Sequence, residues 1–335
     1  MAVFTPVSEQ EAAAFIAPLT LGKLTSLRGI PSGIENTNYF VTTHAGEFVL
    51  TLFERLGKKE LSFYLQLMQH LARKRIPVPE PKADARGRIL LELNGKPACV
   101  VTKLEGRHCL EPAPHHCEQV GDMLARMHQA GSDFQLEQVN LRGFDWWVQA
   151  ADRLLPFLDD ERRGVLLDEL RFQHALASDR LYRTLPRGFV HGDLFRDNVL
   201  FASAAGSDNR TGVEKLSGFF DFYFAGTDVF IYDVAVCLND WCIDRRSGAL
   251  LPAMATVFVK AYERVRPLSS LERRYLPAVL RAAALRFWLS RLVDLHFPRE
   301  SALLHAHDPD HFFRVLCRHR CSSLSSFPDA NTLTS

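Results

Sequence analysis

Residues 191–201, HGDLFRDNVLF, and residues 216–222, LSGFFDF, are the stretches that decide the fold of this chain. In both, short apolar runs are interrupted by Gly, Asp and Asn, which is typical of strands that hold a polar loop at their ends. Asp193 and Asn198 lie in the first stretch, and Asp221 ends the apolar run of the second. Carboxylate and amide oxygens placed in this way suit two tasks of phosphoryl transfer, which are to accept a hydroxyl proton and to hold Mg²⁺.

The residues up to about Lys103 have the pattern of a small antiparallel lobe. NYFVTT (38–43) and EFVLTLF (47–53) are short runs of β-branched and aromatic residues on either side of a turn. Apolar residues then recur at helical spacing over 58–75, until prolines stop the helix. Asn94-Gly95 predicts a hairpin between two further strands, because this dipeptide favours the tight turn that hairpins need.

The chain becomes mainly helical beyond this lobe. Pro114 suits the first turn of a helix and Gly131 suits its end, and further helices are predicted from about Phe144 and from about Asp228. We therefore expect a two-lobed α+β fold. The predicted domains are 1–103 and 104–322, followed by a polar tail over 323–335.

The composition of the chain argues against several classes of function. The chain has 335 residues, of which 47% are hydrophobic and 24% charged, as in ordinary globular proteins with sizeable cores. Its 40 basic and 39 acidic residues lack the broad positive field of nucleic-acid binders. No apolar run approaches the ~18 residues of a membrane span. Seven scattered cysteines indicate reduced thiols, so we expect a cytoplasmic protein. Since neither nucleic acid nor a membrane is favoured, we expect its partner to be a small molecule.

Several strings together resemble a known kinase family. HGDLFRDNVLF and FFDF resemble the catalytic loop and metal-binding carboxylate of the aminoglycoside-phosphotransferase-like kinases, relatives of protein kinases in which the loop has H-G-D in place of H-R-D. GIENTNYFVTT, FVLTLFE and DFYFAGTDVFIYDVAVCLNDWC are similar to bacterial homoserine kinases of the kinase-like type. The resemblance implies a protein-kinase-like fold and the ATP- and Mg²⁺-dependent phosphorylation of a small-molecule hydroxyl. It favours L-homoserine as acceptor, giving O-phospho-L-homoserine in threonine biosynthesis.

The resemblance also implies roles for individual residues. Asp193 matches the catalytic base or hydroxyl-orienting carboxylate, and Asn198 and Asp221 match the Mg²⁺ ligands. His191 matches a support of the loop, and Asp233 matches a carboxylate that steadies the loop from the following helix. An isolated Asp or Asn more often forms a turn, so these assignments depend on the whole set occurring together.

The expected nucleotide contacts lie in the first lobe. They are Ser32, Gly33, Asn36, Asn38, Thr51, Val101 and Lys103, with ATP in the cleft behind 100–103. Gly33 permits a close approach of the backbone to phosphate, and small polar neighbours can donate hydrogen bonds to it. Without the downstream catalytic loop, the same segment would favour an ordinary surface turn.

Thr51 departs from the family pattern. Most related kinases carry at this position the lysine that holds the α- and β-phosphates and pairs with a helix glutamate, and its loss weakens phosphate binding unless another group replaces it. Glu60 is the best match to that glutamate and has no evident partner in the sequence. Lys58 and Lys59 are candidates to compensate, although exposed charges are also common at helix starts. A pseudokinase that binds ATP without turnover therefore remains an alternative.

The acceptor site is less clear from sequence. Arg196 lies in the catalytic loop, where its planar fork suits a carboxylate, and Asp240, with Asn239 and Trp241, suits an ammonium group or a pocket wall. Two other interpretations stay open, because Arg196 can pair with a neighbouring acid and Trp241 can fill the core. Other acceptors also stay open, namely choline, which favours an aromatic cage, an aminoglycoside, which calls for several acidic residues, or a sugar.

Three further groups of residues have simpler interpretations. Trp146 and Trp147 are adjacent on a helix and point apart, so at least one is expected in the core. Two His/Cys clusters lack the paired spacing of zinc sites; they are 115–117 and the group His305, His307, His311, Cys317, His319 and Cys321. The basic residues of the helix around Pro277 are expected on a solvated face; they are Arg273, Arg274, Arg281 and Arg286.

Overall fold

The computed structural model describes residues 4–31, 36–203, 214–298 and 308–321. Ser32, Gly33 and the predicted tail lie outside these ranges. The chain forms two compact units, the first comprising 1–106 and 217–223, the second 107–216 and 224–335. The predicted division assigns 217–223 to the second domain. This segment belongs to the first unit because the backbone N–H of Phe219 donates to the carbonyl of Pro77 at 3.0 Å.

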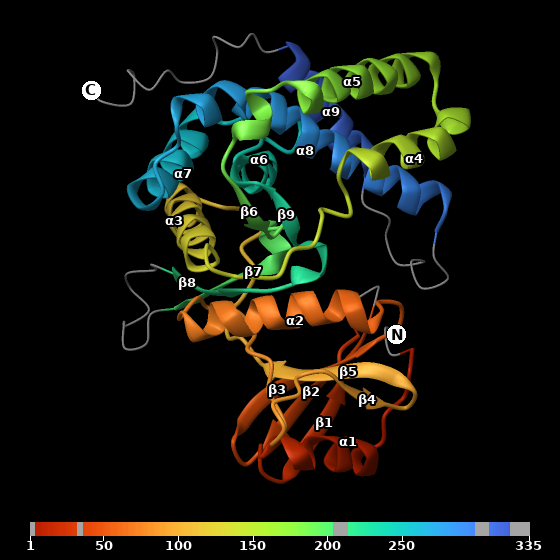
Figure 1. Cartoon of the computed structure of the whole chain (residues 1–335), viewed down its shortest axis with the longest axis vertical. Coiled ribbons are helices and arrows are strands. Elements are labelled where there is room, and N and C mark those ends of the chain that lie inside the picture. The colour runs from red at the N-terminus through yellow and green to blue at the C-terminus, as the bar shows by residue number, and fades with distance from the viewer. Residues whose placement is uncertain (1–3, 32–35, 204–213, 299–307, 322–335) are drawn as a thin grey trace. The chain divides into compact units, whose positions relative to one another are not determined.

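The first unit is built on a five-stranded antiparallel sheet in the order β1-β2-β3-β5-β4. Its elements are α1 (Glu9–Ile16), a 3₁₀ turn (Ala17–Leu19), β1 (Leu24–Gly29), β2 (Asn36–Thr43), β3 (Gly46–Phe53), α2 (Lys58–Arg73), β4 (Leu91–Leu93) and β5 (Lys96–Thr102). Helices α1 and α2 cover opposite faces of this sheet, as Figure 1 shows. On the face that α1 covers, Phe15 and Ile16 of α1 are buried in one cluster with Val41 and Leu50 of the sheet.

Local signals account for these elements. Ser8 caps α1 by accepting from the backbone N–H of Glu11, whose carboxylate accepts from the N–H of Ser8 in return. The predicted hairpin is also present, because Asn94 (φ 51°) and Gly95 (φ 73°) form the left-handed turn between β4 and β5. The predicted hairpin and the predicted amphipathic helix are therefore confirmed.

The second unit is mainly helical, with two short β-ribbons, β6-β9 and β7-β8. Its helices are α3 (Pro114–Ala130), α4 (Phe144–Leu154), α5 (Asp160–Ser178), α6 (Phe230–Trp241), α7 (Pro252–Val265), α8 (Ser270–His296) and α9 (Pro309–Cys321). Its strands are β6 (Arg187–Val190), β7 (Val199–Ser203), β8 (Glu214–Phe219), whose end belongs to the first unit, and β9 (Gly226–Val229). Short 3₁₀ turns occur at Leu155–Phe157, Tyr182–Thr184, Arg196–Asn198 and Phe222–Phe224.

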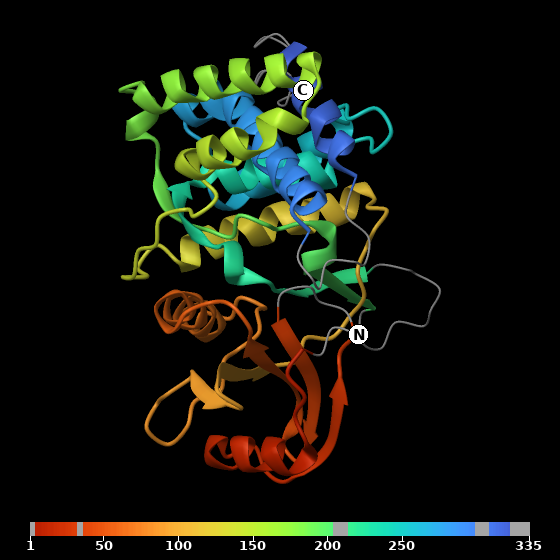
Figure 2. The ribbon, with the colours of Figure 1, turned by 90° about the vertical axis from the view of Figure 1, so that its right-hand side faces the viewer.

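Helices α6 and α8 form the centre of the second unit. Residues 231–241 of α6 are all buried, and α3, α7 and α8 surround this helix (Figures 1 and 2). A helix that is covered on most sides, as α6 is, has no solvated face.

The prediction that the basic residues of α8 lie on a solvated face is wrong for two of them. Arg286 is 3% exposed, and Arg281 pairs with the buried Glu169.

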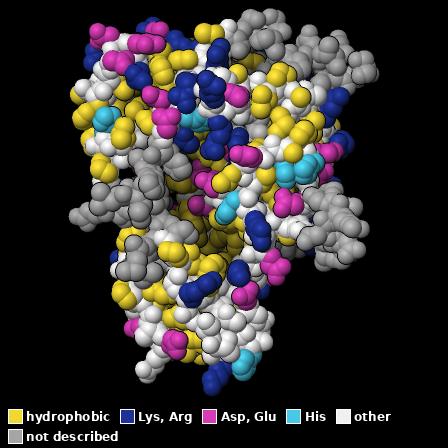
Figure 3. All heavy atoms as spheres, turned by 180° about the vertical axis from the view of Figure 1, so that it is seen from behind, with side chains coloured by type: hydrophobic (Ala, Val, Ile, Leu, Met, Phe, Trp, Pro, Cys, Tyr) yellow, Lys and Arg dark blue, Asp and Glu magenta, His cyan; other side chains and the backbone are white. Residues whose placement is uncertain are grey.

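The surface mixes both signs of charge. Figure 3 shows Lys and Arg side chains next to Asp and Glu side chains on the drawn face of each unit. Within the described ranges, every helix is too short or too polar to cross a bilayer. Trp147 is buried in the core, as the prediction for the Trp146–Trp147 pair requires.

Candidate active site

The loop 191–198 connects β6 to β7 and is fixed at both ends, because each strand is paired in its own ribbon. Gly192 has φ +76°, a conformation that favours glycine. A Cβ atom at this position would lie 2.9 Å from the carbonyl oxygen of Phe224, closer than real side chains approach. The H-G-D sequence is therefore required here by backbone geometry as well as by chemistry.

Asp193 and Asn198 lie side by side in this loop. The Asn198 side-chain nitrogen donates to the backbone carbonyl of Asp193 at 2.8 Å and to its carboxylate oxygen Oδ2 at 3.3 Å. Because the amide nitrogen is used in this way, the amide oxygen of Asn198 is the atom that remains for a metal ion. Asp193 itself is only partly buried, so its carboxylate is accessible to an acceptor.

Asp233, on α6, anchors the start of the loop. Its two carboxylate oxygens accept from the backbone N–H groups of His191 at 2.6 Å and of Gly192 at 2.7 Å. The His191 ring is buried, and its Nδ1 accepts from the backbone N–H of Asp193 at 3.3 Å. These contacts are those that the predicted supporting roles of His191 and Asp233 require.

His128 of α3 extends this anchor and was not predicted. Its Nε2 lies 3.1 Å from Oδ2 of Asp233, and its Nδ1 lies 2.8 Å from the hydroxyl of Tyr262. Burial lowers the pKa of His128, although Asp233 raises it in part, and the ring bridges Asp233 and Tyr262. His128 and Asp233 are 105 residues apart, and no pattern in the sequence connects them.

The predicted substrate residues Arg196, Asp240 and Trp241 have partners within the second unit. Asp240 accepts from the backbone N–H of Arg196 at 2.9 Å, and the Arg196 guanidinium is occupied by this carboxylate and by the carbonyls of Asp240 and Leu110. Burial raises the pKa of Asp240, while Arg196 lowers it in part. Trp241 is fully buried and donates to the carbonyl of Leu194 at 3.0 Å. Asp240 and Trp241 therefore support the loop from α6, and contacts of Arg196, Asp240 and Trp241 with an acceptor stay a prediction.

Arg286 of α8 is the charged neighbour of Asp193 that sequence reasoning missed. Its Nη1 lies 3.6 Å from Oδ1 of Asp193, and its side chain is 4% exposed. The signal in the sequence was its setting, because apolar residues flank it on both sides in LRFWL (285–289), as expected for a buried position.

Three predicted nucleotide residues of the first unit, Asn36, Asn38 and Thr51, lie close together near one end of the β2–β3 pair, whereas Lys103 lies near the other end. Thr51 donates from its hydroxyl to Oδ1 of Asn38 at 2.7 Å, and the Asn38 amide lies 3.4 Å from the carbonyl of Asn36. Val101 lies in β5, where it pairs with Val49. Just beyond β5, the Lys103 ammonium is 2.7 Å from Glu47.

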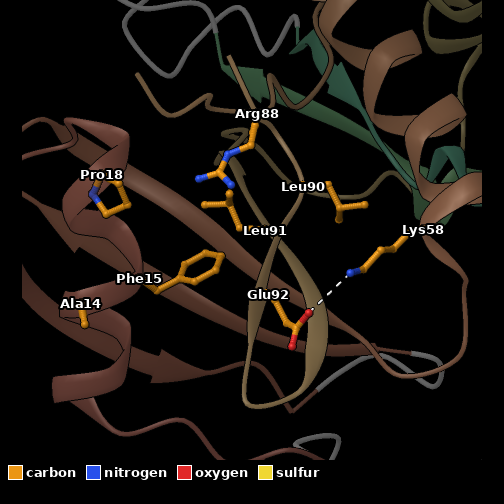
Figure 4. A pocket seen from close by; sticks show the side chains of 8 residues that line it. All are labelled: Ala14, Phe15, Pro18, Lys58, Arg88, Leu90, Leu91 and Glu92. Carbon is orange, nitrogen blue, oxygen red and sulfur yellow. Dashed lines mark hydrogen bonds and ion pairs between the residues drawn. The ribbon is translucent and has the colours of Figure 1, made fainter. Parts of the chain in front are cut away.

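Lys58, one of the two candidates to compensate for the missing lysine, and Glu60, the expected partner of that lysine, both have other contacts. Lys58 lies 3.5 Å from Glu92 in a pocket of about 480 Å³ (Figure 4), which none of the predicted nucleotide residues lines. The other cation of this pocket, Arg88, pairs with Asp84. Glu60 caps α2 by accepting from the backbone N–H of Gly57 at 2.9 Å.

Asp221 belongs to the first unit, where it follows β8. Its φ is +66°, a left-handed conformation that is uncommon for a residue other than glycine. Residues held in such conformations are often found at functional sites. The convergence of Asp221 with Asn198 on one metal ion stays a prediction.

The His/Cys clusters have other partners where they are described. Nδ1 of His116 accepts from the backbone N–H of Ala113, and Nε2 of His319 lies 2.7 Å from Oδ1 of Asn239. In the described part of the chain, no three His, Cys, Asp or Glu residues form a group that could hold a metal ion. His305 and His307 lie outside that part.

Comparison with known proteins adds to this geometry. The model of the phosphotransferase enzyme family matches residues 26–268. A protein named homoserine kinase from Polaromonas naphthalenivorans is 55% identical over 94% of this chain and 97% of its own length, and one from Burkholderia vietnamiensis is 49% identical over 99% of both. Among solved structures, an amicoumacin kinase in complex with AMP-PNP and Ca²⁺ aligns with a TM-score of 0.67 and 18% identity, covering 94% of this chain and 92% of that one. The predicted two-lobed α+β, protein-kinase-like fold class is confirmed by this likeness.

Proposed function

We propose that this chain, which belongs to the phosphotransferase enzyme family, transfers the γ-phosphoryl group of ATP to the side-chain hydroxyl of L-homoserine. The observation that carries the proposal is the 55% and 49% identity to proteins named homoserine kinase over nearly the whole length of both chains. The product would be O-phospho-L-homoserine, an intermediate of threonine biosynthesis. The enzyme would act on a small molecule in the cytoplasm.

The loop geometry supports a definite role for Asp193. Its carboxylate would accept a hydrogen bond from the acceptor hydroxyl and take up the proton as the oxygen attacks phosphorus. A positioned general base contributes roughly 10²- to 10⁴-fold to a rate. Asn198 and Asp233 would hold the loop so that the carboxylate keeps this orientation, since positioning and charge neutralisation carry most of phosphoryl transfer.

The donor atoms also suit the cofactors. The Asn198 amide oxygen and the Asp221 carboxylate are hard oxygen ligands of the kind that Mg²⁺ prefers, and Mg²⁺ normally completes its shell with water and phosphate oxygens. When bound, the ion would neutralise charge on the phosphates. The AMP-PNP and Ca²⁺ in the amicoumacin kinase agree with the use of a nucleotide and a divalent cation. Asn36, Asn38 and Thr51 would contact ATP, together with Ser32, Gly33, Val101 and Lys103.

An acceptor panel tests the proposal. The purified protein is incubated with ATP, Mg²⁺ and one alcohol at a time, namely L-homoserine, choline, an aminoglycoside and a sugar. ADP release is measured, and the product is identified by ³¹P NMR. We expect turnover with L-homoserine and a new phosphate-ester signal. Turnover with another alcohol alone would reassign the acceptor. Nucleotide binding without turnover of any of them would favour the pseudokinase that Thr51 leaves as the alternative.

A further inference from the structure

The Arg286 guanidinium is buried but poorly paired. Its single acidic neighbour in the described chain is Asp193, at 3.6 Å, which is longer than a hydrogen bond. Its Nε has no hydrogen-bond partner among the described residues. A buried charge is costly unless it is both paired and hydrogen-bonded. Arg286 therefore has one long ion pair, with Asp193, and a buried nitrogen that has no hydrogen bond in the described chain.

Aromatic rings fix the orientation of this guanidinium. Its central carbon lies 3.8 Å from the ring centroid of Phe287 and 4.9 Å from that of Phe224. A guanidinium that stacks on aromatic rings presents its N–H groups only at its edge, where they match the two oxygens of a carboxylate. The stacking therefore orients the N–H groups of Arg286 toward an anion that lies in the plane of the guanidinium.

Arg281, on the same helix, shows what a completed site of this kind looks like. It stacks over Phe172, with 3.6 Å from its central carbon to the ring centroid. Its Nε lies 3.1 Å from both carboxylate oxygens of Glu169, and its Nη2 lies 2.6 Å from one of them. Arg286 has the same stacking without the bidentate carboxylate, so we infer that a carboxylate from outside the chain completes it.

We propose that Arg286 binds the carboxylate of the acceptor and thereby selects an amino-acid alcohol over neutral or cationic alcohols. This inference rests on the proposed function. An acceptor hydroxyl must lie about 2.6–3.2 Å from Asp193. In L-homoserine the carboxyl carbon is at most roughly 5 Å from the hydroxyl oxygen by covalent geometry. Because Arg286 lies 3.6 Å from Asp193, one L-homoserine molecule can contact Asp193 with its hydroxyl and Arg286 with its carboxylate.

A pair of acceptors separates this role from a structural one. L-homoserine and 3-aminopropan-1-ol share the hydroxyl, the chain and the ammonium group, and only the first has a carboxylate. We expect wild type to favour L-homoserine by at least about 10-fold in kcat/KM. In Arg286→Met, the loss in kcat/KM should be about 10- to 150-fold greater for L-homoserine than for 3-aminopropan-1-ol, the value of one charge-assisted hydrogen-bonded contact. Equal losses on both acceptors would overturn the proposal, because Arg286 would then act through Asp193 or through the fold.

Two further variants keep the test decisive. Arg281→Met is the matched control, since it removes a stacked arginine from the same helix, and it should lower the melting temperature without changing the preference between the two acceptors. Arg286→Lys keeps the charge and loses the planar fork, so it should fold if Arg286→Met does not, and it should lose part of the preference. An unchanged preference in Arg286→Lys and Arg286→Met, or wild type that uses both acceptors equally, would overturn the inference alone. Wild type that does not turn over L-homoserine would overturn the proposed function.

Discussion

The Asp193 carboxylate has a different neighbour at each of its two oxygens. Asn198 contacts Oδ2, and Arg286 approaches Oδ1 from α8. Asp197, four positions after Asp193, is exposed. The two carboxylates therefore differ in their surroundings although they share one loop, and substitution can separate catalysis from general effects on the loop.

The change Asp193→Asn should lower kcat about 10²- to 10⁴-fold, because the amide cannot accept the hydroxyl proton. The KM for ATP and the melting temperature should stay close to those of wild type, since the shape of the side chain is kept. Steady-state kinetics with L-homoserine and ATP measure this. Asp197→Asn is the matched control and should retain activity within a few-fold. Comparable losses in both variants would remove Asp193 from its assigned role.

The change Gly192→Ala should damage catalysis through the backbone. An alanine at φ +76° costs about 1–2 kcal/mol of the free energy of unfolding, and its Cβ atom would also push against the carbonyl of Phe224. Gly87 has φ +78° with open space around it, so Gly87→Ala carries the first cost alone. We expect both variants to melt earlier and only Gly192→Ala to lose kcat, by about 10-fold or more for a misplaced catalytic group. Full activity of Gly192→Ala would contradict the tight loop geometry.

At the scale of elements, close packing of helices supports the loop. Helix α3 carries His128, whose contact with Asp233 couples α3 to α6, and α3 also packs against α7. Gly121 of α3 makes the α3–α7 approach possible, because a Cβ atom there would lie 2.3 Å from the carbonyl oxygen of Phe258. The close packing of α3 against α7 therefore depends on having glycine, which has no side chain, at position 121.

Two helical glycines should respond in opposite directions to the same substitution. Gly121→Ala should lower the free energy of unfolding by about 1–3 kcal/mol, because the helices must move apart. Gly164 of α5 is exposed with open space around its Cβ position, so Gly164→Ala should raise the free energy of unfolding by about 0.5–1 kcal/mol through better helix propensity. Urea unfolding followed by circular dichroism compares them. Stabilisation by both would show that the α3–α7 contact is looser than described.

At the scale of the molecule, buried histidines tie the stability of the second unit to pH. Burial, together with a smaller effect of the nearby Arg281, lowers the pKa of His319 to about 4. The unfolded state takes up a proton near the ordinary value of about 6.5, whereas the folded state does not until about pH 4. The contribution of His319 to stability is therefore present above about pH 6.5 and is lost as the pH falls toward 4.

The stability difference between wild type and His319→Gln should therefore shrink as the pH falls. We expect a decrease of up to about 1.4 kcal/mol per pH unit between pH 6.5 and 4, and a constant difference above pH 7.5. All four tryptophans lie in the second unit, so their fluorescence during urea unfolding reports on this unit. A difference that does not depend on pH would mean that the pKa of His319 is the same in the folded and unfolded states.

Much of the fold follows from local sequence. The Ser8 cap, the helix after Gly57 and the Asn94-Gly95 turn were all predictable, because each depends on residues within a few positions of one another. The catalytic loop was predictable for the same reason, since Asp193 and Asn198 lie in one short string. The sequence by itself thus determined the order of elements and the kind of chemistry.

The tertiary structure decided which charged side chains surround that loop. Arg196 and Arg286 both look like surface or substrate residues in the sequence. Folding closes Arg196 against Asp240, 44 residues away, and leaves Arg286 beside Asp193 with a nitrogen unpaired. The reason is physical: whether a guanidinium is satisfied depends on which distant carboxylates and rings the helices bring to it, and the residues next to it in the chain do not specify these partners.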